Sequence, residues 1–145
     1  MAVGFIEPSE PAPPSAVDRL ERRIGRSLPD DYRSFLLRQD GGWMQMNDGA
    51  VKEILGVRDD ASYNASLWRA LDTFNERVPN WLLPVARDEY GNLYALSLRQ
   101  QDFGSVWFWD HEEEADEGEP PSEENIELRA PNWDEFLAGL QPVHI

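Results

Sequence analysis

The sequence predicts a single α+β domain built on a central antiparallel or mixed β-sheet of about five to six strands. The main evidence is the segment 82–111, where three short runs rich in large apolar and β-branched residues are separated by turn signals at residues 90–92 and 102–104. Such runs are typical of consecutive antiparallel strands joined as a meander. The chain has 145 residues, of which 41% are hydrophobic, so it is long enough to bury about 70% of its unfolded-state surface around one core.

Two helices are predicted before the sheet, after a flexible, Pro-rich leader over residues 1–14. Ser15 offers an N-cap for the first helix and Gly25 a natural end. Pro29 opens the second helix, which the glycine pair at 41–42 ends. Each helix has one apolar face, formed by Val17, Leu20 and Ile24 in the first and by Tyr32, Phe35 and Leu36 in the second. We expect the two helices to pack on the sheet as an αα-hairpin.

The segment 43–57 is a weaker signal. Its Asp-Gly pair at 48–49 predicts a hairpin, or a loop leading into an edge strand. Trp43, Met44 and Met46 in this segment are interpreted as core-lining residues, because large apolar residues are most often buried. A contact surface is the alternative interpretation.

Three elements complete the predicted domain, which spans residues 15–140. A middle helix is expected from about residues 62–64 to Val78, where Pro79 ends the apolar periodicity. Residues 125–130 alternate like a final strand. Asn132 then caps a C-terminal helix whose inward-facing residues are Trp133, Phe136, Leu137 and Leu140. The tail over residues 141–145 is expected to be loose.

The last of the central runs is apolar on both faces. In a strand, Val106 and Phe108 point one way, while Trp107 and Trp109 point the other. Both faces of this strand must therefore be covered, either by the protein's own helices or by a partner.

Charge is the strongest compositional feature. The formal net charge is −15, which opposes binding to nucleic acid or anionic membranes and favours cationic partners. The alternative interpretation of this negative charge is that it only keeps the protein soluble. Residues 111–124 are predicted to form an acidic loop, which contains no lysine or arginine and eight carboxylates: Glu112, Glu113, Glu114, Asp116, Glu117, Glu119, Glu123 and Glu124.

The chain contains no cysteine, so disulfides and thiolate metal sites are impossible. The N-terminal residues lack the basic and apolar regions of a signal peptide, and no apolar run approaches the length of a membrane span. We therefore expect a cytoplasmic protein.

The sequence does not predict an active site, a cofactor or a metal centre. It has two histidines and none of the common catalytic motifs. Asp88 and Asp110 are the only acids that a glycosidase-like pair would use, because each ends an apolar strand; we favour the simpler role of binding turn amides. A calcium loop starting at Asp110 fails, because an EF-hand needs Gly and Glu where Ala115 and Pro121 stand.

Protein binding is the function that the residues favour. Aromatic anchors beside a charged rim are typical of protein–protein hot spots, and Trp107 and Trp109 share one strand face just before the acidic loop. The alternative is that a helix covers them. The predicted partner-binding residues are Trp107, Trp109, Asp110, Glu112, Glu113, Glu114, Asp116, Glu117 and Glu119.

The motif D-x-x-G-N-x-x-x-L, which begins at Asp88, and the following V-W-F-W-D-H-E resemble the centre of the SUKH superfamily, the domains related to the Smi and Knr proteins of yeast. The resemblance extends to L-P-x-D-Y-R-x-F-L-L…G-G upstream and to W-x-E-F-L-x-x-L downstream, over residues 15–140. The motif positions that it marks as structural are Leu28, Pro29, Tyr32, Phe35, Leu36, Gly41, Gly42, Asp88, Gly91, Asn92, Phe136 and Leu137.

This resemblance implies an immunity protein of a bacterial polymorphic toxin system. Such a protein binds a cognate toxin, often a nuclease, in the cell that makes it. An acidic protein suits a basic toxin, because carboxylates can occupy a groove meant for phosphates. Two alternatives stay open. One is a regulatory or scaffolding module, as for the yeast relatives. The other is a carboxylate-dependent hydrolase. The oligomeric state is left open.

Overall fold

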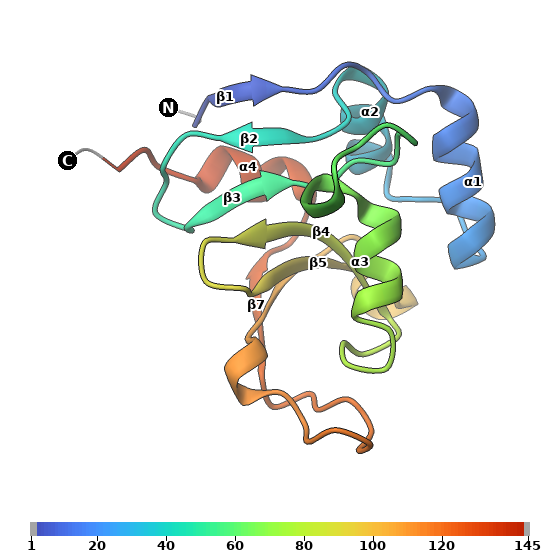
Figure 1. Ribbon diagram of the computed structural model, residues 1–145, viewed down its shortest axis with the longest axis vertical. Helices are drawn as coiled ribbons and strands as arrows, with labels where there is room; N and C mark the ends of the chain where they lie inside the picture. The colour runs from blue at the N-terminus through green and yellow to red at the C-terminus, as the bar shows by residue number, and fades with distance from the viewer. Residues whose placement is uncertain (1–2, 144–145) are drawn as a thin grey trace.

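A computed structural model describes residues 3–143 of the chain. Its seven strands form one sheet in which every neighbouring pair is antiparallel and the spatial order follows the chain order (Figure 1). The sheet therefore has more strands than the five to six expected. In chain order they are β1 (Phe5–Pro8), β2 (Gly42–Met44), β3 (Val51–Ile54), β4 (Leu82–Asp88), β5 (Leu93–Ser97), β6 (Val106–Trp109) and β7 (Ile126–Ala130).

The predicted centre of the fold is confirmed. Strands β4, β5 and β6 are sequential antiparallel neighbours, with Leu83 opposite Leu96 and Tyr94 opposite Phe108. Strand β7 lies within the segment 125–130 where the final strand was predicted, and it pairs with β6. The alternation of apolar and turn residues was sufficient to place β4, β5 and β6, whereas β7 was predicted as a strand from its own alternation, without its neighbour.

The leader is where the structure differs most from the expectation. Instead of a flexible segment, residues 3–14 contain β1, which pairs with β2, while residues 1–2 lie outside the described residues. The Phe5 ring lies 6.3 Å from the Phe35 ring, and Val3 and Ala12 are buried. Pro8 is tolerated because it ends an edge strand, where a missing N–H costs little. Strands β2 and β3 form the hairpin that the Asp-Gly pair predicted. Because β3 also pairs with β4, it is an internal strand and not the edge strand of the alternative interpretation.

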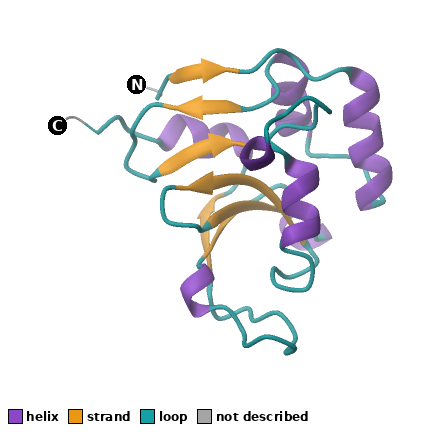
Figure 2. Cartoon of the chain, in the orientation of Figure 1, coloured by secondary structure: helices purple, strands orange, loops and turns teal. Residues whose placement is uncertain are grey.

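The described part of the chain contains four α-helices, which are packed with the sheet: α1 (Pro14–Ile24), α2 (Asp30–Arg38), α3 (Leu67–Thr73) and α4 (Trp133–Gly139). Short 3₁₀ turns lie at η1 (Tyr63–Ala65), η2 (Gln100–Asp102) and η3 (His111–Glu113). The expected αα-hairpin is matched only in part, because α2 packs against α4 as well as against α1. Figure 2 shows α1, α2 and α3 gathered toward one side of the strands and α4 behind them.

Some of the predicted helix ends are confirmed and others are wrong. Helix α1 begins at Pro14, so Ser15 is not its N-cap, and it ends at Gly25 in the left-handed conformation (φ 77°) as predicted. Helix α2 follows Pro29 and has its C-cap at Gln39, before the glycine pair. Asn132 caps α4 by accepting a hydrogen bond from the Glu135 amide, as predicted.

Helix α3 is much shorter than the helix predicted to reach Val78. It starts after Ser66, whose hydroxyl accepts a hydrogen bond from the Arg69 amide, and its C-cap is Phe74. Two residues later Glu76 has a positive φ of 67°, a conformation that no helix accepts. The chain therefore leaves the helix and crosses to β4 as an irregular segment.

Both faces of the sheet are covered, as the apolar β6 requires. Tyr94 on one face contacts Phe136 of α4, with ring centroids 4.9 Å apart. Trp109 on the other face lies under Phe74 and Val78, which follow α3. Figure 1 shows α3 in front of the sheet and α4 behind it. The motif residues Leu28, Tyr32, Phe35, Leu36 and Phe136 are buried and Leu137 is half-buried, so all six belong to the core.

The large apolar residues at positions 43–46 are partly core residues and partly surface residues, so each of the two interpretations of this segment holds for some of them. Met44 is buried, whereas Trp43 and Met46 are 43% and 48% exposed. The tail is held rather than loose as far as the structure describes it, because the Val143 amide donates to the Met46 carbonyl at 3.1 Å. The rest of the expected tail, residues 144–145, lies outside the described residues. No helix between residues 3 and 143 is long and apolar enough to cross a membrane.

Candidate partner-binding surface

The acidic loop, residues 111–124, leaves the sheet after β6 and returns to β7 at the same end. Asp110 and Asn125 close its base: the Asp110 amide donates to the Asn125 carbonyl at 3.0 Å, and the Asn125 side-chain amide donates to the Asp110 carbonyl at 2.8 Å. The Asp110 carboxylate accepts a hydrogen bond from the Glu112 amide and so starts η3. In Figure 1 the loop extends beyond the strands as a separate projection.

Two residues from the segment between α3 and β4 hold this loop in place. The Arg77 guanidinium donates from Nε and Nη2 to the two carboxylate oxygens of Glu114, at 3.0 and 2.8 Å. Four residues on, the Trp81 indole N–H donates to Glu123 at 3.4 Å. The hydrogen bonds from Arg77 lower the pKa of Glu114 below its ordinary value, because they favour the charged carboxylate.

Between the acidic loop and residues 75–77 lies a cavity of about 870 Å³, which we call the acidic groove. Its carboxylates come from Glu76, Glu114, Asp116, Glu117 and Glu119. Among the described residues, the one basic side chain in its lining is that of Arg77, whose guanidinium is already bound to Glu114. The groove therefore presents a concentrated negative field, which low-dielectric walls focus toward a cationic ligand.

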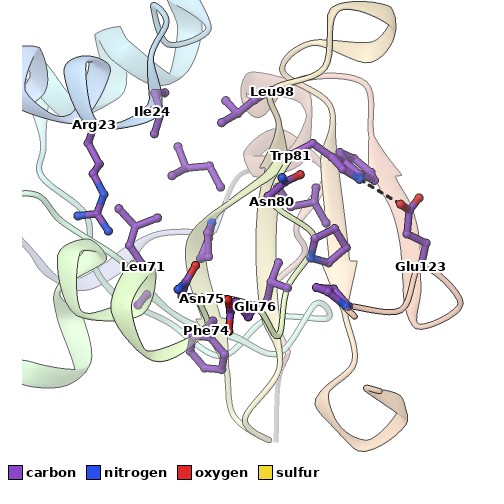
Figure 3. Close-up of a pocket in the computed structure, with 17 residues that line it drawn as sticks. Arg23, Ile24, Leu71, Phe74, Asn75, Glu76, Asn80, Trp81, Leu98 and Glu123 are labelled. Carbon is purple, nitrogen blue, oxygen red and sulfur yellow. Dashed lines mark hydrogen bonds between the residues drawn. The ribbon is translucent and has the colours of Figure 1, made fainter. Parts of the chain in front are cut away.

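A second cavity of about 610 Å³ continues from the acidic groove and shares Asn75, Glu76 and Pro121 with it. We call it the apolar groove after the apolar side chains that line it, although polar and charged residues also line it: Arg23, Asn75, Glu76, Asn80 and Glu123. Figure 3 shows Ile24 and Leu71 on one side of this cavity and Trp81 and Leu98 on the other, with Glu123 at its margin. Apolar side chains beside a charged rim make up the composition of a protein-binding hot spot.

The aromatic residues of this surface differ from the predicted ones. Trp109 is completely buried, so it is not an exposed anchor but a core residue covered by Phe74. Trp107 is half-buried; its ring meets the Trp81 ring edge-on at 5.5 Å, and the Arg99 guanidinium lies 3.5 Å from the centre of the Trp81 ring. Periodicity assigned both tryptophans to the correct strand face, but it could not show that the chain after α3 folds over that face.

The structure brings together only part of the predicted acidic set. Glu114, Asp116, Glu117 and Glu119 line the acidic groove. The other predicted acids do not: Glu112 and Glu113 are exposed in η3, and Asp110 caps that turn. Sequence reasoning missed Leu71, Arg77, Trp81 and Leu98 as part of this surface, because they precede the acidic loop by 13 residues or more and no local pattern connects them to it.

The D-x-x-G-N motif forms the turn between β4 and β5. The Asp88 carboxylate accepts hydrogen bonds from the amides of Tyr90 and Asn92 at 2.8 and 2.7 Å. Gly91 has a positive φ of 89°, and a Cβ at that position would lie 3.1 Å from the His111 ring. Asn92 accepts a hydrogen bond from the His111 amide and so joins the turn to the start of the acidic loop.

This turn bears on the hydrolase alternative. Asp88 is buried and its carboxylate binds turn amides together with the Asn92 side chain, which is the simpler role weighed above. The Asp110 carboxylate likewise binds an amide. Within residues 3–143 no group of three or more His, Asp or Glu side chains lies close enough to hold a metal ion.

One buried acid was not foreseen. Asp40, directly before the glycine pair, accepts hydrogen bonds from the amides of Val57 and Arg58, each at 2.8 Å. Burial raises the pKa of this carboxyl above its ordinary value, although the two amide hydrogen bonds act in the opposite direction. Gly41 follows with φ 85°, where a Cβ would lie 2.2 Å from the Ile54 carbonyl oxygen. These residues fix the end of α2 to β3.

The meander sheet, its flanking helices and the two adjoining grooves define a small acidic α+β domain. The chain belongs to the SMI1 / KNR4 family (SUKH-1), whose family model matches residues 11–139. The resemblance based on the three sequence motifs is thereby confirmed.

Individual relatives agree with this assignment. The chain is 30% identical to the SPbeta prophage-derived uncharacterized protein YokK of Bacillus subtilis (strain 168), over 64% of this chain and 59% of that protein. It is 38% identical to uncharacterized protein YnaB of the same strain, over 38% of this chain and 35% of that protein. The chain thus spans about three fifths and about one third of these relatives. A crystal structure of a protein from Pseudomonas syringae pv. tomato shares the fold, with a TM-score of 0.53, 20% identity and 74% coverage of both chains.

Proposed function

We propose that this protein is an immunity protein that binds a cognate protein toxin with a basic surface, in the cytoplasm of the cell that makes the toxin, and blocks its activity. The observation that carries the proposal is the apolar groove directly beside the acidic groove. Membership of the SUKH family supports it, because immunity to toxins is the role for which this family is known.

The electrostatics of the acidic groove support a basic partner. Asp116, Glu117 and Glu119 are exposed and have no basic side chain bound to them within the described residues. A nuclease toxin needs a cationic groove to bind phosphates, and carboxylates placed in that groove would exclude the nucleic acid. Attraction between opposite patches raises the association rate toward about 10⁸–10⁹ M⁻¹s⁻¹ at low salt, and added salt screens it.

The apolar groove supports a long-lived complex. Ile24, Leu71 and Leu98 are half-buried around it, and covering them with an apolar side chain of the toxin would stabilise the complex by about 25 cal/mol for each Å² removed from water. Such contacts act mainly on the dissociation rate. The two grooves are therefore expected to affect different rate constants.

The test is binding to the toxin encoded beside this gene, identified by its toxicity and by rescue of growth when this protein is co-expressed. The variant Asp116→Asn/Glu117→Gln/Glu119→Gln should associate more slowly, with a flatter dependence on salt. A control with three other exposed carboxylates neutralised, Glu7→Gln/Glu10→Gln/Glu89→Gln, should keep the parent rate. Leu71→Ala should chiefly raise the dissociation rate. Equal association of parent and groove variant across the salt titration would exclude the acidic groove as the docking site.

A further inference from the structure

Strand β7 is an open edge of the sheet. It is the last strand in the order, and no strand of the described residues lies beyond it. Glu127, Leu128 and Arg129 are all exposed, and Leu128 is an exposed apolar residue at 53%. An edge with free backbone groups and an exposed apolar side chain is a template for pairing with another strand. The opposite edge, β1, is only four residues long and ends in Pro8, which limits such pairing.

The side chains of β7 divide between the two faces of the sheet. Leu128 lies opposite Trp107, on the face where Trp107 contacts Trp81, whereas Glu127 lies opposite Phe108 on the other face. The Arg129 guanidinium lies 4.6 Å from the centre of the Phe108 ring, on the same face as Glu127. The register with β6 shifts by one residue between Leu128 and Ala130, so Arg129 is the extra residue of a bulge and has no partner residue in β6. Pairing on the free edge is therefore limited to the short segment Glu127–Arg129, which ends at this bulge.

This tripeptide is complementary to a second copy of itself. In an antiparallel pair related by a two-fold axis, the residue on the axis faces its own copy and its neighbours face each other. An axis at Leu128 places leucine opposite leucine and Glu127 of each copy opposite Arg129 of the other. An axis at Glu127 would set two carboxylates together, and an axis at Arg129 two guanidinium groups, both of which are destabilising. The chemistry of the edge thus selects one register.

We propose that two copies of this protein associate through β7, antiparallel and centred on Leu128. In this arrangement the acidic loop, which precedes β7, lies at opposite ends of the paired strands in the two copies, so their negative charges are kept apart. The acidic and apolar grooves do not include β7 and stay free. The contact is small compared with a standard interface of about 1,600 Å², so the dimer forms reversibly with increasing protein concentration.

The absence of native cysteine makes the register directly testable. Residues directly opposite each other have Cβ atoms about 4.5–5.5 Å apart, close to the distance of a disulfide. Under mild oxidation the full chain carrying Leu128→Cys should form a covalent dimer many times faster than chains carrying Ile6→Cys or Tyr90→Cys. Those control positions are 65% and 69% exposed and lie away from β7. Cross-linking of Leu128→Cys no faster than the controls would overturn the proposal.

A charge exchange separates this register from any other contact between copies. Glu127→Arg alone, or Arg129→Glu alone, places like charges opposite each other and should abolish dimers in sedimentation velocity between about 10 μM and 1 mM. An equimolar mixture of the two variants restores both opposite-charge pairs and should restore the dimer. Thermal unfolding verifies that both exposed variants are folded. A mixture that stays monomeric while the parent dimerises would refute the register, and a monomeric parent at about 1 mM would refute the dimer.

Discussion

Arg77 and Glu114 are joined by two parallel hydrogen bonds, of 3.0 and 2.8 Å, that connect the chain after α3 to the acidic loop 37 residues further on. The Arg77 guanidinium also lies 4.8 Å from the centre of the Phe74 ring. One side chain therefore links the acidic groove to the core on that face of the sheet. The width of the groove depends on this pair, since the two residues belong to its two opposite walls.

Glu114→Gln should therefore loosen the acidic loop at a small cost in stability. Arg77 is 42% exposed in its side chain, so we expect a loss of no more than about 1 kcal/mol. The lowered pKa of Glu114 fixes the pH dependence. The stabilisation is fully present above the ordinary glutamate pKa of about 4.3 and is lost as the pH falls through the lowered pKa of the folded state.

Urea unfolding of parent and Glu114→Gln at about pH 7 and about pH 2 measures this difference. It should be present at the higher pH and absent at the lower. Glu112→Gln is the matched control, because the Glu112 side chain is exposed and forms no ion pair within residues 3–143. A difference of the same size at both pH values would show that the charge of Glu114 is not the source of the stabilisation.

Asn92 should be a structural residue rather than a catalytic one. Its side-chain amide donates to Asp88 at 2.9 Å, and its carbonyl oxygen accepts from the His111 amide at 3.0 Å. Asn92→Ala removes both bonds and should cost about 1–3 kcal/mol in free energy of unfolding. Glu89→Ala in the same turn is exposed and should stay within about 0.5 kcal/mol of the parent. Equal effects of the two substitutions in urea titrations would contradict this role for the motif.

The sequence predicted the fold best where strands that follow one another in the chain also pair with one another in the sheet. Strands β4 to β6 could be predicted because each apolar run and each turn is local, and β7 because its own residues alternate. Strand β1 could not, because four residues before a proline-rich stretch carry no period of their own and β2 supplies their partner. The early end of α3 follows from the positive φ of Glu76, and a glutamate gives no sign of that conformation.

The candidate site was predictable only in its acidic half. The acidic residues of the loop lie close together in the sequence and can be recognised there. The opposite wall of the acidic groove is formed by residues 75–77, which tertiary packing brings to the loop. Trp109 shows the same limit, because strand alternation fixes the face of a side chain but not what covers that face. The structural role of Asp40 could not be predicted, because the amides that its carboxylate binds lie 17 and 18 residues further along the chain.

Asp40 should be among the most sensitive polar positions of the fold. It is 3% exposed and binds the Val57 and Arg58 amides. Asp40→Ala leaves both donors without their acceptor, and each buried unsatisfied group costs about 1–3 kcal/mol. Asp40→Asn keeps one acceptor oxygen and should lose less. Urea titrations of the two variants decide this, and an alanine variant as stable as the asparagine variant would show that water replaces the carboxylate.

Trp109 and Phe108 are neighbours in β6 that should differ sharply in their contribution to stability. Trp109 is fully buried between the sheet and Phe74, whereas Phe108 is half-buried and covered on its outer side by Arg129. Trp109→Ala should therefore cost about 3–5 kcal/mol, a large part of the total stability of a small domain, and Phe108→Ala clearly less. Trp109→Phe keeps most of the apolar volume and should remain folded.

In a toxin-binding assay the folded Trp109→Phe variant should bind with the parent rate constants, because this side chain lies beneath the grooves rather than in them. A faster dissociation of that variant at unchanged stability would place Trp109 in the interface after all.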